Sequence, residues 1–330
     1  MMWILGFTLL LLKIIVLLAI LLGIAANLIL IERKLLGRFQ IRFGPNRAGP
    51  FGIYQPIADG IKMLLQEDII PAAADRQIFK LAPAVVATVA ILIAAVVPFG
   101  DSITVWGRQV PMVITDLNVG LLYVLALSSI SVYGVALGGW ASNSKYSLLG
   151  AIRGTAQMIS YELPLGLSLV PIVMLAGSFS LVDIVDAQAR YPFILVQPVA
   201  FIIFVVSSVA EAKRLPFDLA EAENELIAGY HTEYSGMRFA LFFLGEYVHM
   251  IVLGALVAVF FLGGWRGPLL PPVVWLLLKT MLVPFFLIWT RATLPRLRYD
   301  QLMHFCWKIL VPAALINIVA TGGIVLLLRS

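Results

Sequence analysis

The stretch that decides the fold class reads FALFFLGEYVHMIVLGALVAVFFL and covers residues 239–262. A helix needs about 20 predominantly apolar residues to cross the hydrocarbon core of a bilayer, and this stretch is long enough. Its one acidic side chain, Glu246, stands several residues away from either end. The stretch therefore predicts a transmembrane helix that carries a carboxylic acid inside it.

The composition of the whole chain agrees with this interpretation. Of its 330 residues, 61% are hydrophobic and only 12% are charged, and the mean hydropathy is +0.99. Such a chain has too few polar residues to cover a surface that faces water on all sides. These values exclude a soluble fold and predict an integral membrane protein.

Eight apolar runs in all have the length of a membrane span, and each is bounded by charges or by Gly and Pro. The sequence thus predicts an all-α integral membrane protein with about eight transmembrane helices. We find no fixed-period repeat and no low-complexity linker, so residues 1–330 are interpreted as a single polytopic membrane domain. The predicted spans are Trp3–Ile31, Ile78–Phe99, Leu117–Trp140, Thr155–Ala176, Phe193–Ala212, Phe239–Leu262, Pro272–Thr290 and Lys308–Leu328.

Most of the Lys and Arg residues fall in four connections that an eight-span topology places on one side: residues 32–77, 141–154, 213–238 and 291–307. Lys and Arg are enriched in the cytoplasmic loops of membrane proteins, so these long loops are predicted to be cytoplasmic and both termini periplasmic. The opposite side holds only Arg108, Arg190, Arg266 and Arg329. This asymmetry explains the net charge of +5 and removes the reason to predict a nucleic-acid partner.

The first long loop begins with Gly and Pro and continues into an amphipathic helical pattern. Its apolar positions share one face, and a helix of this kind is predicted to lie along the membrane interface. No Gly-Lys-Ser/Thr follows the glycines, so the loop does not read as a phosphate-binding site. The apolar positions are Ile53, Ile57, Ile61, Leu64 and Leu65.

The sequence shows no pattern typical of a metal site or a redox-cofactor site. The one cysteine, Cys306, excludes an internal disulfide, and there is no CxxC pair and no Cys/His cluster. His231, His249 and His304 lack the spacing of a metal site. We therefore predict no metal and no redox cofactor in this chain. The first apolar run has no small-residue cleavage site after it and is interpreted as a retained span.

A second informative stretch, residues 213–236, reads KRLPFDLAEAENELIAGYHTEYSG and collects five acids. Asp218 and Glu221 have the spacing of a capping box at a helix start. Glu221 and Glu225 stand one helical turn apart, and like charges at this spacing repel each other. For Glu223, Glu225 and Glu233, simple solvation in a loop and a functional role stay equally open.

Charged residues inside the spans are harder to explain by solvation. An ionised side chain at the bilayer centre costs about 3 kcal/mol on insertion scales, and a carboxyl group avoids this cost by taking up a proton. For Glu162 and Glu246 we favour a proton relay over a structural salt bridge. For Lys279 the two roles stay open, and Lys13 stays unassigned. At the end of the fifth span, Glu211 is followed by the cations Lys213 and Arg214.

Four segments together resemble one known family. They read ERKLLGRFQIRFGPNRAGPFGIYQPIADGIKML, GGWASNSKYSLLGAIRGTAQMISYELPLGLSL, AEAKRLPFDLAEAENELIAGYHTEYSGMRFALFFLGEY and RATLPRLRYDQLMHFCWK. From about Glu32 to Lys308, and in the same order, they closely resemble the H subunit of proton-pumping NADH:quinone oxidoreductase, respiratory complex I. The mitochondrial counterpart of that protein is NADH dehydrogenase subunit 1. The resemblance implies an eight-span fold in a bacterial inner membrane.

The resemblance also implies a function. Members of this family carry no cofactor themselves; FMN and iron–sulfur clusters are expected in partner subunits of the membrane and peripheral arms. The chain is expected to form part of the quinone chamber and to couple reduction of quinone, the substrate, to proton translocation. Motif positions near the quinone are Arg33, Asp59, Arg214 and Arg291. Motif positions of the proton path are Glu162, Glu211, Asp218, Glu221, Glu223, Glu225 and Glu246. Glu32, Glu233 and Asp300 match positions of less definite role.

Two features depart from the family pattern. Lys213 and Ala220 stand where many relatives have Asn and Pro, and the span Leu117–Trp140 has no acid where some members have one. Two other functions are considered. A quinone-independent anchor subunit of a related membrane-bound hydrogenase is the main alternative. A secondary transporter is disfavoured because the sequence shows no pair of symmetric halves with broken helices.

Overall fold

The computed structural model describes residues 2–105 and 108–329. Within these ranges, the side chains of residues 2–5, 103–105, 108, 223, 224 and 329 lie outside the description. Arg108, Arg329 and Glu223 are therefore placed by their backbone alone. The fold is helical apart from one short antiparallel hairpin, in which Ser102 pairs with Pro111 and Val105 with Arg108.

Long helices and short helices both occur along the chain. Two 3₁₀ turns, Pro50–Gly52 and Gly229–His231, and one π-helical turn, Cys306–Leu310, complete the order. The helices are α1 (Met2–Phe39), α2 (Gln55–Leu65), α3 (Arg76–Ala94), α4 (Gly120–Ala141), α5 (Lys145–Ala176), α6 (Leu181–Ala187), α7 (Phe193–Val196), α8 (Pro198–Glu211), α9 (Glu223–Leu226), α10 (Gly236–Phe261), α11 (Pro272–Thr293), α12 (Tyr299–Phe305) and α13 (Val311–Arg329); the strands are β1 (Ser102–Val105) and β2 (Arg108–Pro111).

Seven stretches of the described chain are helical, long and apolar enough to span a membrane, which confirms the all-α membrane fold. The predicted span Phe193–Ala212 is different, because it is broken into α7 and α8 at Gln197. Pro198 opens α8 and has no backbone N–H to continue the preceding turn. The 14 residues of α8 are short for a complete crossing, so the count is seven long helices and one broken span.

Several helices extend further into the predicted loops than expected. Helix α5 begins at Lys145 and not at Thr155, and α1 continues past Ile31 to Phe39. The last span begins at Tyr299 and reaches α13 through the π turn. A charged residue marks the point where a helix leaves the apolar layer, but the helix itself continues beyond that point. The spans predicted from the positions of charges were therefore too short. The amphipathic helix predicted in the first loop forms as α2.

Helix α10 lies at the centre of the bundle. Its most apolar window is 83% buried, against 17% to 50% in the other six spans. Close approach is possible because α10 carries glycines at its contacts: a Cβ on Gly254 would collide with the Thr280 carbonyl oxygen of α11. A Cβ on Gly245 would lie 3.2 Å from Ala87 Cα of α3. Glu246 is thereby held in the interior.

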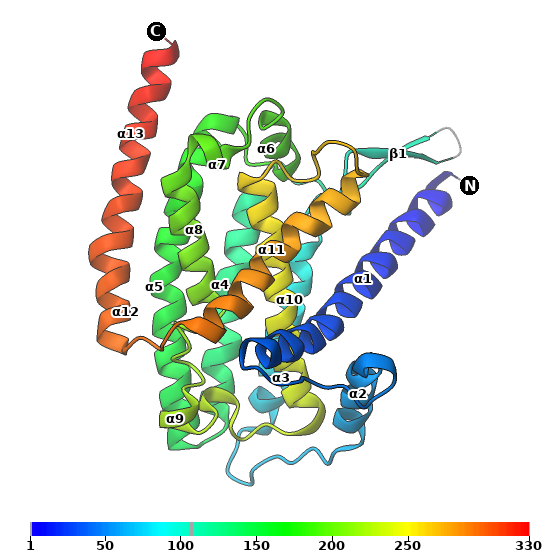
Figure 1. The fold of residues 1–330 in the computed structure, drawn as a ribbon, viewed down its shortest axis with the longest axis vertical. Coiled ribbons are helices and arrows are strands. Elements are labelled where there is room, and N and C mark those ends of the chain that lie inside the picture. Colours follow the sequence, from blue (N-terminus) through cyan, green and yellow to red (C-terminus); the bar gives the residue numbers. More distant parts are fainter. Residues whose placement is uncertain (1, 106–107, 330) are drawn as a thin grey trace.

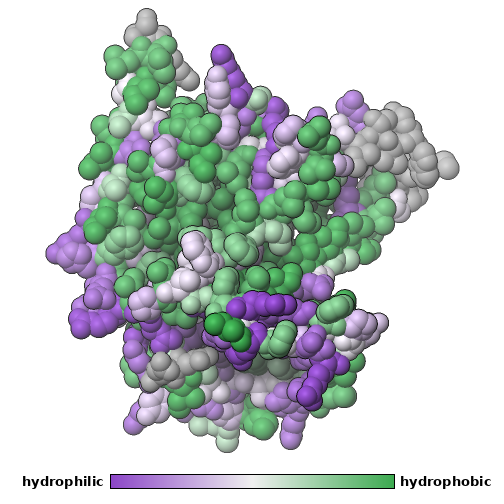
Figure 2. All heavy atoms as spheres, in the orientation of Figure 1, coloured by the Kyte–Doolittle hydropathy of each residue, from purple (hydrophilic) through white to green (hydrophobic). Residues whose placement is uncertain are grey.

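Figure 1 shows how the two ends of the bundle differ. The N- and C-terminal ends of the described chain lie at the same end, together with the β1–β2 hairpin and α6 (Figure 1). Helices α2 and α9 lie at the opposite end with the long connections. Figure 2 shows a hydrophobic surface over the middle of the bundle and hydrophilic residues gathered towards the end with α2 and α9.

Candidate functional site

A turn after α8 brings two cations into the interior at the loop end of the bundle. The chain reverses at Lys213, which has a φ of 53°, and the Arg214 carbonyl oxygen accepts a hydrogen bond from Phe217 N at 2.8 Å. Lys213 and Arg214 are each only 6% exposed. A charge buried to this degree is tolerated only with partners of opposite charge.

Arg214 lies at the centre of the buried ion network, by which we mean Glu32, Arg214, Glu246, Tyr247 and Arg291. Its Nη1 donates to Glu32 Oε1 of α1 at 3.1 Å. Its Nε lies 2.7 Å from Glu246 Oε1 of α10, an ion pair in which the N–H is not directed at the carboxylate. The guanidinium also lies 4.9 Å from the ring centre of Tyr247.

Glu32 is the acceptor that joins three helices in this network. It is 3% exposed and accepts from Arg291 Nη1 of α11 at 2.5 Å and from the Tyr247 hydroxyl of α10 at 2.7 Å. The two arginines thus face two carboxylates, so the charges of the cluster balance. The predicted quinone residues Arg214 and Arg291 are brought together through Glu32, to which the motif alone gave no definite role.

The capping box predicted for Asp218 and Glu221 does not form. Helix α9 begins only at Glu223, and no side chain caps it. Asp218 instead accepts from Arg296 Nη2 at 3.1 Å. Burial raises the pKa of Asp218 although Arg296 opposes the shift. The predicted repulsion between Glu221 and Glu225 on one helix face is wrong as well, because Glu221 precedes the helix.

Glu221 lies among charges of both signs. Burial, followed by the carboxylates of Glu246 and Asp218, raises the pKa of Glu221 to about 8, although Arg214 and Lys213 oppose the shift. Burial lowers the pKa of Lys213, whose Nζ donates to the Tyr230 hydroxyl at 3.2 Å. The turn therefore holds a carboxyl group and an ammonium whose protonation states are sensitive to neighbouring charge.

Inside the membrane spans, two consecutive serines of α4 bind the remaining predicted acids. Ser128 Oγ donates to Glu211 of α8, and Ser129 Oγ donates to Glu162 of α5. His249 Nε2 of α10 lies 3.8 Å from Glu211 Oε1. A cavity of about 10 Å³, roughly the room that one water needs, is lined by Ser128, Glu211 and His249 among apolar side chains. The span without an acid thus supplies two hydroxyl groups in this position.

The remaining predicted residues lie at the surface. Arg33 Nη1 and Asp59 Oδ2 form an ion pair at 2.7 Å, with side chains 46% and 28% exposed. Arg153 pairs with Glu225 at 2.7 Å and thereby lowers the pKa of Glu225. Asp300 pairs with Arg298 on the surface at 2.7 Å. Within the described residues no ion pair or hydrogen bond joins Glu233 to the network, and the side chain of Glu223 lies outside them.

Comparison with known proteins places this arrangement in a family. The sequence matches the NADH dehydrogenase family over residues 12–322. It is 68% identical over 324 residues to an H subunit (number 2) of the NADH-quinone oxidoreductase of Syntrophobacter fumaroxidans, with 98% of each chain covered. The chain belongs to the family of NADH-quinone oxidoreductase H subunits. The relatives include an H subunit (number 2) of Geobacter sulfurreducens, 63% identical over 95% of each chain, and the H subunit of Thermomicrobium roseum, 55% identical over 93% of each chain. The family resemblance seen in the sequence is confirmed.

Some residues of the site in this member of the H-subunit family were not predicted. Tyr247, Ser128, Ser129 and Arg296 were all passed over, because a hydroxyl or a loop cation carries no recognisable spacing on its own. Tyr247 follows Glu246 directly, and the two serines stand in a span that otherwise has no acid. Among the described residues, no group of three or more His, Cys, Asp or Glu is arranged to hold a metal ion.

Lys279, for which a relay and a structural role were both open, contacts backbone carbonyl groups. Its Nζ donates to the carbonyl oxygens of Leu262 at 2.6 Å, Gly264 at 2.9 Å and Arg266 at 2.6 Å. These oxygens lie at and beyond the C-terminal end of α10, where the last carbonyl groups have no partner within the helix. The contacts favour the structural role in this protein.

Lys279→Met should therefore destabilise the protein without uncoupling it. The three carbonyl oxygens lose their donor, at a cost of about 1–3 kcal/mol. The check is thermal unfolding of the detergent-solubilised complex, with Lys308→Met at an exposed lysine of the last span as the matched control. Unchanged unfolding in Lys279→Met, or loss of proton translocation in a fully stable variant, would contradict the structural assignment.

Proposed function

We propose that this chain is the membrane subunit of a proton-pumping NADH:quinone oxidoreductase that forms part of the quinone chamber and couples quinone reduction to proton translocation. The observation that carries the proposal is the buried ion network around Arg214. It is adjacent in the chain to the surface pair Arg33–Asp59, because Glu32 precedes Arg33, and to the serine-bound Glu211, which ends α8 three residues before Arg214.

Neighbouring residues of α1 connect the buried ion network to the proposed quinone chamber. Glu32, buried, and Arg33, exposed, are consecutive residues of α1. Arg291, on the same carboxylate, is one-third exposed, with 34% of its side chain accessible. A negative charge that forms on a quinone beside these arginines competes with Glu32 for them. The change is passed to Arg214 and Glu246, because both share the same counter-charges.

The protons for quinone reduction have a matching source. Reduction to the quinol takes up two electrons and two protons, and a carboxyl group with a pKa near the working pH is suited to supply them. Glu221, with its pKa raised to about 8, holds its proton at neutral pH. A shift of Arg214 towards the quinone or away from it changes how readily that proton is released.

The path into the membrane continues at Glu211 and Glu162. Each carboxyl group accepts a hydrogen bond from a serine hydroxyl of α4, and a hydroxyl group can both accept and donate a proton. Glu211 ends α8 and Lys213 follows two residues later, so the turn and the serine-bound carboxyl group are adjacent along the chain. These contacts support a route from the turn towards other membrane subunits.

The proposal also implies which partner subunits the chain contacts and how it is oriented in the membrane. Electrons arrive from a partner, where FMN and iron–sulfur clusters are expected, and the chain contacts further subunits of the membrane and peripheral arms. The end with α2 and α9 carries the basic loops and faces the cytoplasm by the positive-inside rule. Both termini then face the periplasm of a bacterial inner membrane.

The proposal is tested on the assembled complex in proteoliposomes, with NADH as the electron donor and ubiquinone or menaquinone as the acceptor. We expect reduction of at least one quinone, inhibition by Arg291→Gln, and proton translocation that accompanies turnover. A quinone-independent anchor subunit requires the opposite result. If the intact wild-type complex reduces neither quinone while its soluble module stays active, the anchor function replaces the one proposed here.

Quinone reduction should depend on pH through Glu221. Its raised pKa means that the proton is held below about 8 and lost above it, and the stability that depends on this proton declines as the pH rises from the ordinary pKa of 4.5 to about 8. Activity should therefore fall as the pH rises through about 8 in the wild type. Glu221→Gln should reduce quinone slowly at every pH and lack this limb, because glutamine neither ionises nor supplies the proton.

The matched control for this profile is Glu225→Gln. Glu225 belongs to the same acidic stretch but is exposed and paired with Arg153. Its replacement should leave the alkaline limb in place. An identical limb in Glu221→Gln would show that another group sets the profile.

A further inference from the structure

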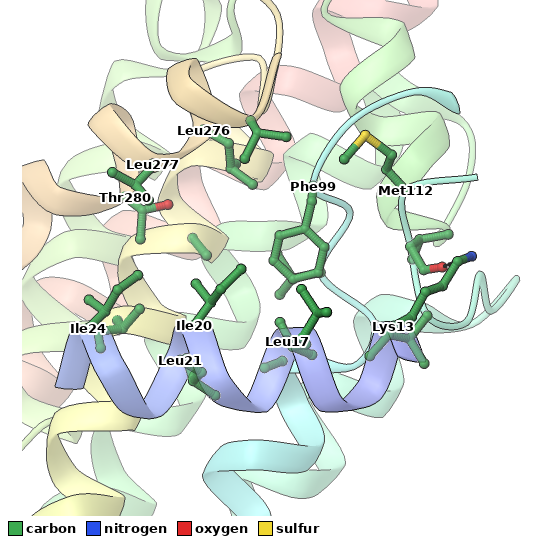
Figure 3. A pocket seen from close by; sticks show the side chains of 18 of the residues that line it. Lys13, Leu17, Ile20, Leu21, Ile24, Phe99, Met112, Leu276, Leu277 and Thr280 are labelled. Carbon is green, nitrogen blue, oxygen red and sulfur yellow. Dashed lines mark hydrogen bonds between the residues drawn. The ribbon is translucent and has the colours of Figure 1, made fainter. Parts of the chain in front are cut away.

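An apolar groove runs along α1 at the end of the bundle that carries the termini. Figure 3 shows its wall on α1, with Leu17, Ile20 and Ile24, facing Phe99 of the loop after α3 and Leu277 of α11. The volume is about 410 Å³, within the range of small-molecule sites in proteins. Thr280 and Lys13 are the polar exceptions among the lining side chains.

Lys13 is the only charge at the groove within the described residues. Its Nζ donates to the carbonyl oxygens of Pro111 at 2.7 Å and Val113 at 3.3 Å. Figure 3 shows Lys13 at one end of the groove, near Met112. No ion pair of Lys13 occurs in the described part of the chain. Two carbonyl dipoles orient the ammonium, but among the described residues its positive charge has no counter-ion and its third N–H has no acceptor.

The hydrogen-bond partners of Lys13 show which end of the bundle it occupies. Pro111 is the last residue of β2 and Val113 follows it, and Figure 1 shows the hairpin at the end that carries the termini. Arg33 lies 20 residues further along α1, towards the opposite end with the basic loops. Lys13 is therefore the charge at the hairpin end of the groove, and the apolar walls extend from it along α1.

The groove is open on the side of α1 that faces away from the bundle. Leu12 and Ile20 line it and are 57% and 51% exposed, and on the α11 side Leu277 is 41% exposed. An occupant can therefore enter laterally from the bilayer without rearrangement of the helices.

We propose that this groove binds one acyl chain of an anionic phospholipid of the leaflet on the side of the termini, with the lipid phosphate at Lys13. The apolar walls match an acyl chain, and the uncompensated ammonium at the hairpin end matches a phosphate. A quinone tail carries no charge that would pair with Lys13. A helix of a partner subunit covers apolar walls equally well, but it leaves the cation unpaired unless it brings its own acid to this point.

The test uses the assembled complex in vesicles of phosphatidylcholine and phosphatidylglycerol, with a trace of phosphatidylglycerol that carries a photoreactive acyl chain. Illumination followed by peptide mass spectrometry should place the label on α1 and α11 at groove positions. Ile20→Trp fills the groove from an exposed position and should remove this label. Lys13→Gln should reduce it to the level given by a photoreactive phosphatidylcholine probe. Arg190→Gln, at a cation outside the groove, should leave it unchanged.

Three results would overturn the proposal. No label on the groove of the wild type means that a partner helix covers it. Equal labelling in Ile20→Trp and wild type means that the probe reacts from the bulk bilayer. Displacement of the label by a long-chain quinone, but not by unlabelled phosphatidylglycerol, assigns the groove to a quinone tail. The labelling requires no turnover, so it is independent of the function proposed above.

Discussion

Arg214→Gln is expected to abolish quinone reduction and to lower the stability of the protein by about 3–5 kcal/mol, the cost of removing one partner from a buried ion pair. Glu246 loses its ion-pair partner, and Glu32 retains only Arg291 and Tyr247. The amount of assembled complex and its NADH:quinone activity measure the two effects separately. A variant that assembles and reduces quinone at the wild-type rate would contradict the role of Arg214.

Two further variants distinguish the effect of losing an ion pair at the surface from the effect of leaving a buried charge without its partner. Arg33→Gln breaks an ion pair at the surface, and such pairs are worth about 0–1 kcal/mol, so assembly should be nearly unchanged. Combining Arg214→Gln with Glu246→Gln removes both charges of one pair and should recover part of the lost stability. The double variant should still fail in proton translocation, because the pair that links Glu32 to Glu246 is gone.

The sequence was sufficient for the parts of the fold that depend on apolar length. Most of residues 239–262 lie in the membrane helix α10, because Glu246, Tyr247 and His249 are the only polar side chains in this stretch, and α10 proves to be the most buried span. The broken fifth span was missed because Pro198 stands inside a run whose composition is apolar throughout. Whether a proline breaks a helix depends on its position in that helix, and a hydropathy profile carries no information about this position.

For the candidate site, the sequence indicated which charged residues to consider but not which residues they contact. Glu246 is buried inside its span as predicted, whereas Asp218 contacts Arg296 where a helix cap was predicted. Glu32 was given no role by spacing, because its partners Arg214 and Arg291 are 182 and 259 residues away in the chain. Pairings over such separations depend on how the helices pack, and a local pattern does not reveal them.

Glu162→Gln is expected to uncouple the complex: quinone reduction continues while most of the accompanying proton translocation is lost. Glu162 is half-buried and accepts a hydrogen bond from Ser129, and within the described residues no hydrogen bond or ion pair joins it to the buried ion network around Arg214. Glutamine has nearly the same volume and its carbonyl oxygen accepts the serine hydrogen bond, but it cannot take up and release a proton. The fold and the quinone-side charges are therefore preserved.

The control for Glu162→Gln is Asp186→Asn. Asp186 forms an ion pair with Arg266 at 2.5 Å at the other end of the bundle, with more than half of its side chain exposed. This change removes a carboxylate of the same chain outside the proposed path. It should leave both the rate of quinone reduction and the proton yield as in the wild type.

The central claim is that charge at the quinone end of this protein is coupled to proton movement through its buried carboxyl groups. The most direct measurement is the number of protons translocated per quinone reduced in proteoliposomes, for wild type, Glu162→Gln and Asp186→Asn in the same preparation. We predict a large fall in this ratio for Glu162→Gln alone, at a nearly unchanged rate of quinone reduction. A wild-type ratio in Glu162→Gln would contradict the claim.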